Sequence, residues 1–477
     1  MNLKHTYSRR QTTQTQVGKL QIGSDSPIRI QTMANVSTND IDACVAQARR
    51  CIAAGVELIR FTTQGVREVE SLREIHRLIG AEYTVPLVAD VHFQADVADL
   101  AAQVVEKVRI NPGNYIDPAR KFRHIDYTDE EYRCELERLR ARFSRLLSIC
   151  RAHHTAIRLG VNHGSLSDRI MSRYGDTPAG MVESVMEFLR VATDEHFTDI
   201  VISVKASNTR VMVDTVRLLV RQMDQEGMAF PLHLGVTEAG EGEDGRIKSA
   251  VGIGALLADG YGDTVRVSLS ETPENEIPVA QALVDYFVQP SGIRYAATTS
   301  SSLMGDTVVY ANQDTDWPSF QLHAAAECGR LLWQYGATNL ILQNPHFDAE
   351  SLLRLSNDIL QAARVRIYKT EYISCPGCGR TLFDLEKTIA QVKAATQQIL
   401  DPKTGRPVQG LKIGVMGCIV NGPGEMADAD YGYVGAGRGR ISLYRGKECV
   451  LKNIPQECAV QSLLHLIQED MNMSTNQ

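Results

Sequence analysis

Three cysteines near the C-terminal end of the chain have the spacing and setting of a metal or cluster site. Cys375 and Cys378 lie in Ser-Cys-Pro-Gly-Cys-Gly-Arg, and Cys418 lies in Gly-Cys-Ile-Val-Asn-Gly-Pro-Gly-Glu, which ends at Glu425. A Cys-x-x-Cys turn directs two thiolates toward one point, and a third thiolate can complete three corners of a tetrahedron. Iron–sulfur clusters are usually held by four cysteines. Three cysteines with an exchangeable fourth ligand would leave one iron open to a substrate, which suits reductive chemistry.

The same spacing also fits other sites. A single Cys-x-x-Cys can be a redox dithiol, half of a zinc site or a pair of structural thiols. A zinc ribbon normally carries a second Cys-x-x-Cys, and the sequence has none. Cys449 and Cys458 are alternative fourth ligands, but they lack the glycine-rich setting. Cys44 and Cys51, one heptad apart in an amphipathic stretch, indicate ordinary core packing.

A second group of polar residues follows short apolar runs in the first 287 residues. Its cations are Arg60, Arg109, Arg158, Lys205 and Arg266. Crowded cations repel one another unless an anion neutralises them, and guanidinium forks suit phosphate oxygens. One such arginine is more often an ion-pair partner on its own. Five cations at matching positions predict a site for a small, multiply charged phosphate ester.

Other polar residues occupy the same kind of position. Four of them are candidates for general acid–base catalysis or for hydrogen bonds to the non-phosphate part of the ligand: Asp90, His92, His233 and Glu238. Asp90 with the two histidines is also a weaker candidate for a metal site. Further candidates for substrate binding are Asn111, Asn162 and Ser207.

These residues need a scaffold that brings the ends of successive strands together. Stretches with helical spacing of apolar residues separate most of the apolar runs, which predicts parallel strands covered by helices. Eight such units in residues 1–288 fit a closed (β/α)8 TIM barrel, whose active site lies at the C-terminal mouth. A doubly wound open sheet is the alternative, but no Gly-x-Gly-x-x-Gly follows the first run. The predicted strands are Ile28–Met33, Leu58–Thr62, Leu87–Asp90, Lys107–Asn111, Ala156–Leu159, Ile200–Val204, Leu232–Val236 and Thr264–Ser268.

The rest of the chain divides into two parts. For residues 289–365 we predict a short α/β insertion that begins with a loop at Thr298–Ser302. Its predicted strands are Thr307–Tyr310 and Asn339–Leu342, and its predicted helices are Phe320–Tyr335 and Ala349–Ala363. Residues 366–477 predict an α+β domain, in which a helix over Asp384–Ile399 and a turn at Asp401–Arg406 precede a strand at Lys412–Val415 that delivers Cys418. Alternating Arg and Glu in Asp117–Arg151 predict a solvated helix.

Composition narrows the class of protein. The 477 residues carry a formal net charge of −7, which disfavours a general nucleic-acid binder. The N-terminus has no signal-peptide apolar stretch, and no segment has the roughly 20 apolar residues of a membrane-spanning helix. Ten cysteines over this length do not form a secreted disulfide scaffold. We therefore expect a cytoplasmic protein without membrane or nucleic-acid partners.

Several long strings occur in the order typical of one enzyme family. They are Val-Ala-Asp-Val-His-Phe, Arg-Ile-Asn-Pro-Gly-Asn, Ser-Val-Lys-Ala-Ser, Thr-Glu-Ala-Gly and Val-Asn-Gly-Pro-Gly-Glu. The chain resembles the 4-hydroxy-3-methylbut-2-enyl diphosphate synthases from about Gly18 to Leu283 and from about Glu371 onward. The resemblance implies reductive ring opening and dehydration of 2-C-methyl-D-erythritol 2,4-cyclodiphosphate in isoprenoid biosynthesis. It also implies a barrel joined to a [4Fe–4S] domain that resembles half of a sulfite reductase.

The resemblance further assigns roles at matching positions. The cluster ligands would be Cys375, Cys378, Cys418 and Glu425, with Glu425 displaced when the substrate binds iron. Arg60, Arg109, Arg158 and Lys205 would grip the diphosphate with help from Asn162 and Ser207, and Glu238 would lie near the reacting carbons.

The resemblance also implies partners. Ferredoxin or flavodoxin is the expected electron donor. A homodimer is also possible, because short members of the family close the cluster domain of one subunit over the barrel of its partner. The insertion at 289–365 is longer than in those members and shorter than in the plant-like branch.

Two other classes of protein remain as alternatives to this enzyme family. One is a zinc-dependent barrel enzyme acting on a phosphorylated substrate, and the other is a non-catalytic iron–sulfur carrier or sensor.

Overall fold

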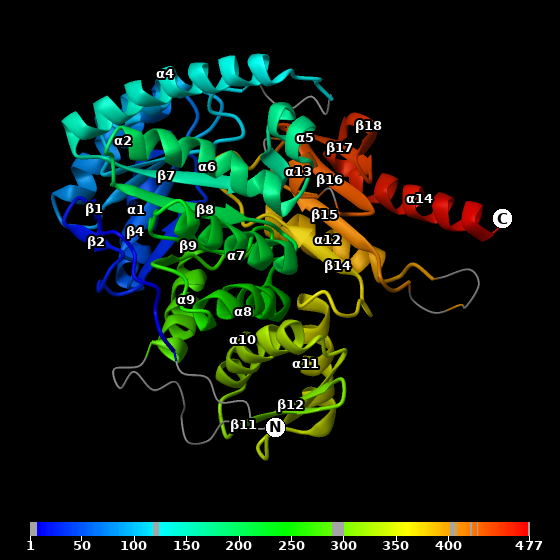
Figure 1. Cartoon of the computed structure of the whole chain (residues 1–477). Coiled ribbons are helices and arrows are strands. Elements are labelled where there is room, and N and C mark those ends of the chain that lie inside the picture. Colours follow the sequence, from blue (N-terminus) through cyan, green and yellow to red (C-terminus); the bar gives the residue numbers. More distant parts are fainter. Residues whose placement is uncertain are drawn as a thin grey trace.

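The computed structural model of the chain describes residues 7–117, 124–288, 300–400, 405, 408–419, 422–426 and 428–475. It has three parts: a barrel unit (residues 7–288), a middle unit (300–365) and a C-terminal unit (366–475). Figure 1 shows the middle unit below the barrel and the C-terminal unit beside it. Among the described residues, no helix is both long and apolar enough to cross a lipid bilayer.

Eight parallel strands form the barrel, in the order β8-β7-β6-β5-β4-β3-β10-β9. A parallel bridge between Ile202 and Leu232 joins the two ends of this sheet, so the barrel is closed. The predicted TIM barrel is confirmed, with boundaries within a few residues of those expected. The strands are β3 (Arg29–Met33), β4 (Leu58–Thr63), β5 (Leu87–Val91), β6 (Lys107–Ile110), β7 (Ala156–Asn162), β8 (Ile200–Lys205), β9 (His233–Leu234) and β10 (Thr264–Val265).

Helices cover the outside of the barrel. Side-chain caps mark where several of them begin: Asp40 accepts a hydrogen bond from the amide of Ala43, and Thr128 forms a capping box with Glu131. Cys44 and Cys51 are buried in the core, as predicted. The helices are α1 (Ile41–Ala53), α2 (Val66–Gly80), α3 (Ala95–Ala101), α4 (Asp129–His153), α5 (Asp168–Tyr174), α6 (Pro178–Asp194), α7 (Thr209–Gln225), α8 (Gly242–Ala258) and α9 (Pro273–Phe287), with a 3₁₀ turn at His163–Ser165.

A short hairpin covers one end of the barrel. The antiparallel hairpin of β1 (Thr15–Val17) and β2 (Leu20–Ile22) packs Val17 and Ile22 against the first residues of several barrel strands, and so plugs the end opposite the mouth. Three-residue strands are too short to give a periodic signal, and the hairpin was not predicted.

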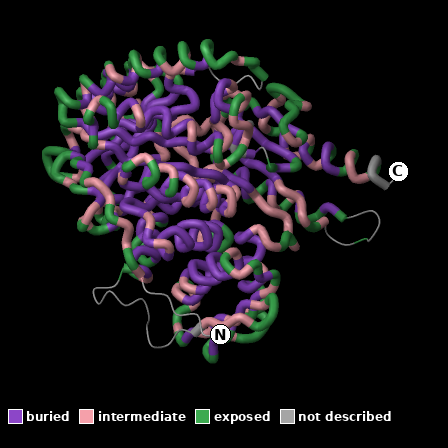
Figure 2. The backbone as a smooth tube through the Cα atoms, viewed as in Figure 1, coloured by how far each residue is buried: buried purple, intermediate pink, exposed green. Residues whose placement is uncertain are grey.

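The predicted solvated helix is α4, whose outer face is exposed (Figure 2). Residues 118–123 of that prediction lie outside the described residues.

The middle unit is a three-stranded sheet with two helices. Strand β12 (Thr307–Ala311) pairs antiparallel with β11 (Ser300–Met304) and parallel with β13 (Asn339–Gln343). Helices α10 (Trp317–Tyr335) and α11 (Ala349–Ala362) confirm the two predicted ones. The loop predicted at Thr298–Ser302 is wrong for Ser300–Ser302, because pairing with β12 outweighs the turn preference of serine. Thr298 and Thr299 lie outside the described residues.

Helix α10 fixes the middle unit to the barrel. It packs closely against α8, where a Cβ atom added to Gly254 would lie 2.7 Å from Cα of Ala326. Small residues at the crossing allow this approach. Thr209 at the start of α7 also donates its hydroxyl to the carbonyl of Ala362, at 2.5 Å. The middle unit is therefore packed on the barrel rather than tethered to it.

The C-terminal unit is a five-stranded sheet in the order β14-β15-β16-β17-β18. Its first three strands are parallel and the rest antiparallel. Its helices α12 (Leu385–Thr396) and α14 (Gln456–Thr475) pack on the sheet around Ile389, Ile413 and Leu463. The strands are β14 (Glu371–Ser374), β15 (Lys412–Met416), β16 (Tyr431–Gly437), β17 (Arg440–Arg445) and β18 (Glu448–Pro455). The α+β expectation and the strand before Cys418 are confirmed; most of the predicted turn at 401–406 lies outside the described residues.

Candidate functional site

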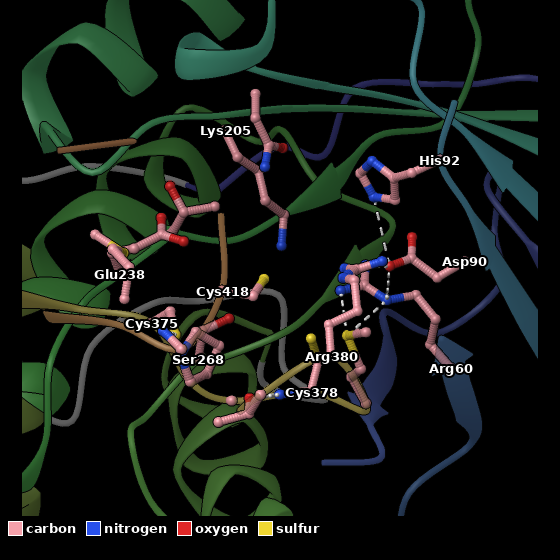
Figure 3. A pocket seen from close by; sticks show the side chains of 18 of the residues that line it. Arg60, Asp90, His92, Lys205, Glu238, Ser268, Cys375, Cys378, Arg380 and Cys418 are labelled. Atoms are coloured by element: carbon pink, nitrogen blue, oxygen red, sulfur yellow. Dashed lines mark hydrogen bonds and ion pairs between the residues drawn. The ribbon is translucent and has the colours of Figure 1, made fainter. Parts of the chain in front are cut away.

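A cavity of about 760 Å3, including its open mouth, lies where the C-terminal unit meets the mouth of the barrel. Side chains from the ends of barrel strands line one side, and the loops that carry the three cysteines line the other (Figure 3). Both sides belong to the same chain. The C-terminal unit thus faces its own barrel. The predicted site residues that line the cavity are Arg60, Asp90, His92, Arg109, Arg158, Asn162, Lys205, Glu238, Arg266, Cys375, Cys378 and Cys418.

Arg109 on β6 is held across the barrel mouth by three partners. Its guanidinium donates to Asp90 Oδ1 at 3.0 Å and to the carbonyl of Gly160 at 2.8 Å, and it contacts His92 Nε2. Gly160 on β7 is required for this position, because an added Cβ would lie 2.4 Å from Arg109 Nε. The glycine thus leaves room for a cation to lie over the strand.

The remaining cations are crowded and buried. The pKa of Arg60 is lowered to about 9, chiefly by burial; the nearby arginines act in the same direction and Asp90 opposes them. Burial and then the neighbouring guanidinium groups also hold the pKa of Arg158 and of Lys205 well below their usual values. Arg158 is 1% exposed, and its Nε and Nη1 have no hydrogen-bond partner among the described residues. An anion in the cavity would supply these missing partners.

Arg266 differs from the other cations because it has its own counterion. Its guanidinium donates to both carboxylate oxygens of Glu276 on α9, at 3.2 and 3.1 Å. Glu276 also accepts the hydroxyl of Thr32 at 3.0 Å. This pair stabilises the barrel wall, while the guanidinium still borders the cavity. Glu276 therefore neutralises much of the charge of Arg266, so we expect Arg266 to attract an anionic ligand less strongly than Arg158.

Asp90 and His92 lie on the same side of the cavity, at the end of β5. Burial opposes ionisation of Asp90, but Arg60, Arg109 and His92 outweigh it and hold the pKa of Asp90 well below its usual value. For His92, burial and then Arg109 lower the pKa to about 3, with Asp90 opposing. At neutral pH the pair is therefore a carboxylate beside a neutral imidazole. The guanidinium of Arg109 donates to Nε2 of His92, so in the neutral imidazole the proton is on Nδ1 of His92.

Glu238 borders the cavity in an unusual backbone conformation. Its φ is 49°, in the left-handed region that glutamate rarely adopts. Such strain persists when the surrounding structure holds it, and it occurs often at functional sites. The carbonyl of Glu238 lies 3.5 Å from Lys248 Nζ, which contributes to fixing this turn.

Three predicted substrate ligands are buried but do not border the cavity: Asn111, Ser207 and His233. Asn111 donates to Ser165 Oγ at 2.8 Å and accepts from the amide of Gly113, so it shapes the loop after β6. His233 contacts the hydroxyl of Thr264 on the neighbouring strand. Strand-end position alone could not separate residues that face the cavity from those that support its wall.

The loops that carry the cysteines converge on the cavity from adjacent strands. Cys375 and Cys378 follow β14, and Cys418 follows β15, which pairs in parallel with β14. Cys375 Sγ accepts a hydrogen bond from the amide of Gly417 at 3.3 Å. The pKa of the Cys375 thiol is raised to about 12, chiefly by burial; the Gly417 amide opposes this, and Cys418 and Cys378 act in the same direction as burial. The three thiols border the same cavity, but among the described residues no three His, Cys, Asp or Glu side chains lie close enough together to hold a single metal ion.

Glu425 ends the short helix α13 (Gly422–Glu425), one turn beyond the Cys418 loop. Its side chain lies outside the described residues, so its predicted role stays a prediction. The backbone of α13 rests on the barrel: a Cβ on Gly424 would lie 1.9 Å from the carbonyl oxygen of Gly164 in the loop after β7. Only glycine permits this approach, which holds the C-terminal unit against the barrel mouth.

Several residues that line the cavity were not predicted. They include Met33, whose Sδ lies 2.7 Å from Arg60 Nη2, and Ser268, two residues beyond Arg266. Arg380 also lines it and comes from the C-terminal unit. Its only signal in the sequence is its place two residues after Cys378. Methionine and serine at strand ends carry no signal of this kind.

Comparison with known proteins identifies relatives of the whole chain. Residues 12–281 match the GcpE TIM-barrel domain, and residues 371–469 match the GcpE protein C-terminal domain. A protein of Bacteroides fragilis is 49% identical over 608 aligned positions, covering 97% of this chain and 96% of that protein. One of Akkermansia muciniphila is 40% identical, covering 98% and 97%. Both are named 4-hydroxy-3-methylbut-2-en-1-yl diphosphate synthase (flavodoxin).

These relatives are longer than the chain. The alignment with the Bacteroides fragilis protein spans 608 positions, whereas the chain has 477 residues. Since nearly all of both proteins is covered, the relative carries residues that have no counterpart here. The two matched GcpE domains leave residues 282–370 between them, which include the middle unit.

Proposed function

The chain belongs to the GcpE family, and we propose that it converts 2-C-methyl-D-erythritol 2,4-cyclodiphosphate to (E)-4-hydroxy-3-methylbut-2-enyl diphosphate in isoprenoid biosynthesis. In this reaction two electrons and two protons enter, the cyclic diphosphate opens by cleavage of a carbon–oxygen bond, and one water leaves. The observation that carries the proposal is the cavity in which three cysteines face a cluster of buried cations.

The cysteine side of the cavity fits a [4Fe–4S] cluster. Three thiols from two adjacent loops border one space, and the amide of Gly417 donates to Cys375 Sγ, a contact that stabilises a thiolate ligand. We assign Cys375, Cys378 and Cys418 as ligands, with Glu425 as the exchangeable fourth. When bound, such a cluster supplies single electrons and a Lewis-acidic iron.

The barrel side of the cavity fits a diphosphate. Arg60, Arg109, Arg158 and Lys205 bring more positive charge to the cavity than Asp90 and Glu238 neutralise. A diphosphate binds here because it restores the balance of charge and supplies acceptors to the free N–H groups of Arg158. Asn162 adds a neutral hydrogen bond.

Three further residues orient these groups and the ligand. Asp90 remains ionised and fixes Arg109, which aims the guanidinium across the barrel mouth. His92 is neutral because of its low pKa, so it can donate a hydrogen bond from Nδ1–H but does not readily accept a further proton. Glu238, held in its strained turn, is assigned to the carbon skeleton of the substrate.

The proposed division of labour follows from this arrangement. Residues 1–288 form the substrate domain, 289–365 the insertion and 366–477 the cluster domain. Closure takes place within one chain, since the cysteines and the cations of the same chain border the cavity. A homodimer is compatible with this arrangement and is not required by it. Ferredoxin or flavodoxin delivers the electrons, and the reaction takes place in the cytoplasm.

One anaerobic experiment tests the proposed function. The full chain is purified without oxygen, its iron and sulfide are assayed, and the cyclic diphosphate is supplied together with reduced flavodoxin. We expect about four irons per chain and formation of the linear diphosphate. Equimolar zinc in a colourless protein would favour a zinc-dependent barrel enzyme instead. A cluster with no affinity for diphosphates would favour an electron carrier or sensor.

A further inference from the structure

Arg380 is a buried cation of the C-terminal unit that reaches into the barrel mouth. It stands two residues after Cys378, in the loop between β14 and α12, and its side chain is 7% exposed. In Figure 3 it extends from the cysteine loops toward Asp90 and Arg60. The roles proposed above give it no part. A buried guanidinium is costly unless it is paired, so its position needs an explanation.

The contacts of Arg380 leave most of its donors unused. Its Nη2 lies 3.4 Å from Asp90 Oδ2, which is long for a charge-assisted hydrogen bond. Its Nε and Nη1 are buried and have no partner among the described residues. Asp90 already accepts from Arg109 at 3.0 Å and lies 4.0 Å from Arg60. One carboxylate therefore serves three guanidinium groups and cannot satisfy all of them.

The loop holds Arg380 at a fixed place beside the cysteines. The hydroxyl of Thr381 accepts from the amide of Cys378 at 3.0 Å, and the amide of Thr381 donates to the carbonyl of Cys378 at 2.9 Å. Gly379 lies against the barrel, where an added Cβ would be 2.9 Å from the carbonyl oxygen of Val36. Arg380 is thus a preorganised donor between the cluster loops and the barrel.

We propose that Arg380 is the cation that the cluster domain contributes to the anion site: its Nε–H and Nη1–H bind a diphosphate oxygen, so that the ligand clamps the cluster domain onto the barrel. The inference rests on the proposed function and extends it, because it gives the cluster domain a share in substrate binding. Six cations among the described residues line the cavity, and five of them come from the barrel. Arg380 alone among them joins ligand binding to the position of the second domain.

The charge around Arg380 supports this role. Arg380 and Arg60 repel each other, and Arg380 contributes to lowering the pKa of Arg60, while Cys378 and Asp90 favour the charged form of Arg380. In the absence of a ligand, Asp90 is the acid that holds it at the barrel. A bound diphosphate relieves this repulsion and provides the two acceptors that Asp90 does not. Closure of the domain is then most favourable when the ligand is present.

The test compares Arg380→Met, Arg380→Lys and the control Lys387→Met in the full chain with its cluster. Lys387 is an exposed cation on α12 of the same unit. The affinity for inorganic diphosphate is measured by anaerobic calorimetry. We expect Arg380→Met to weaken binding by about tenfold or more, Arg380→Lys to weaken it less, and Lys387→Met to bind like the wild type. Equal affinities for the wild type and both Arg380 variants would overturn the proposal.

A second measurement separates ligand binding from a purely structural contact. Hydrogen exchange is followed in the loop at residues 376–382, with and without diphosphate. Without ligand, we expect similar exchange in the wild type and in Arg380→Lys. With diphosphate, we expect less protection of this loop in Arg380→Lys than in the wild type. Faster exchange without ligand together with retained protection would mean that Arg380 is only a latch on Asp90, and would overturn the proposal. Wild-type protein that binds diphosphate but forms no product would contradict the proposed function without deciding this test.

Discussion

Lys248 Nζ lies 3.0 Å from Glu371 Oε1, and this ion pair joins helix α8 of the barrel to the first residue of β14. Arg364, which follows α11 of the middle unit, also donates to Glu371 Oε1, at 2.8 Å. One largely buried carboxylate, 11% exposed, therefore connects all three parts of the chain. Lys369 adds a second bridge, from Asp244 at 2.7 Å to Asp358 at 2.5 Å. The middle unit thus helps to set the position of the C-terminal unit over its own barrel.

Replacing Glu371 by Gln should destabilise this junction in a pH-dependent way. Burial opposes ionisation of Glu371, but Lys248 and Arg364 lower its pKa from 4.5 to about 2. The ionised carboxylate therefore stabilises the folded state fully above pH 4.5, and this stabilisation is lost as the pH falls toward 2. At pH 7 we expect a loss on the order of 3 kcal/mol.

Urea unfolding followed by tryptophan fluorescence measures this loss, since both tryptophans, Trp317 and Trp333, lie in the middle unit. The control is Glu457→Gln, an exposed acid on α14. A difference between Glu371→Gln and the wild type that is as large at pH 3 as at pH 7 would contradict the assignment.

Arg158→Met should have opposite effects on stability and on binding. The guanidinium is buried without a full set of partners, so its removal should stabilise the unliganded protein by about 1–3 kcal/mol. The same change should weaken binding of inorganic diphosphate by about tenfold or more. Thermal unfolding and calorimetry measure the two effects, with the exposed Lys19→Met as the control. Unchanged affinity would remove Arg158 from the anion site.

Gly160→Ala should weaken diphosphate binding through Arg109. The added Cβ would lie 2.4 Å from Arg109 Nε, so the guanidinium must leave its place between Asp90 and the barrel wall. We expect a loss of affinity of about tenfold, with the fold retained. Gly80→Ala, at the end of α2, is the matched control because its Cβ meets nothing within 4 Å. Equal affinities in the two variants would show that the position of Arg109 does not matter.

Cys375→Ser should prevent incorporation of iron. Serine retains the shape of the side chain but lacks the thiolate that a cluster requires. We expect little iron, little sulfide and no visible absorbance in protein purified without oxygen. Cys449→Ser, an exposed cysteine of the same unit, should incorporate iron like the wild type. If both variants incorporated iron equally, Cys375 would not be a ligand.

Glu425→Ala should separate binding from turnover. If Glu425 is the exchangeable ligand, its loss leaves the cations of the barrel intact, so affinity for the cyclic diphosphate should change little. Turnover should fall by at least about tenfold, because the carboxylate that controls the open iron is gone. Both are measured in preparations with matched iron content, with the exposed Glu448→Ala as the control. Normal turnover would remove Glu425 from the ligand set.

Local pattern was enough to predict much of the molecule. Alternating apolar runs and helical spacing gave the eight barrel strands, because strands buried on both faces have a strong composition signal. The cysteine spacing and the cations at strand ends predicted two halves of one site, since these side chains are expensive to bury without a ligand. Family strings then linked the two halves to one reaction.

Other features depended on tertiary contacts. Arg266 and Arg158 occupy equivalent places at strand ends, yet only packing with α9 gives Arg266 a counterion in Glu276. Ser300–Ser302 became a strand through pairing with a partner. The cavity, and the place of Arg380 within it, depend on the C-terminal unit resting on the barrel of its own chain, which the close approach of Gly424 to Gly164 allows. Contacts between residues hundreds of positions apart leave no local pattern, so only the folded structure could decide them.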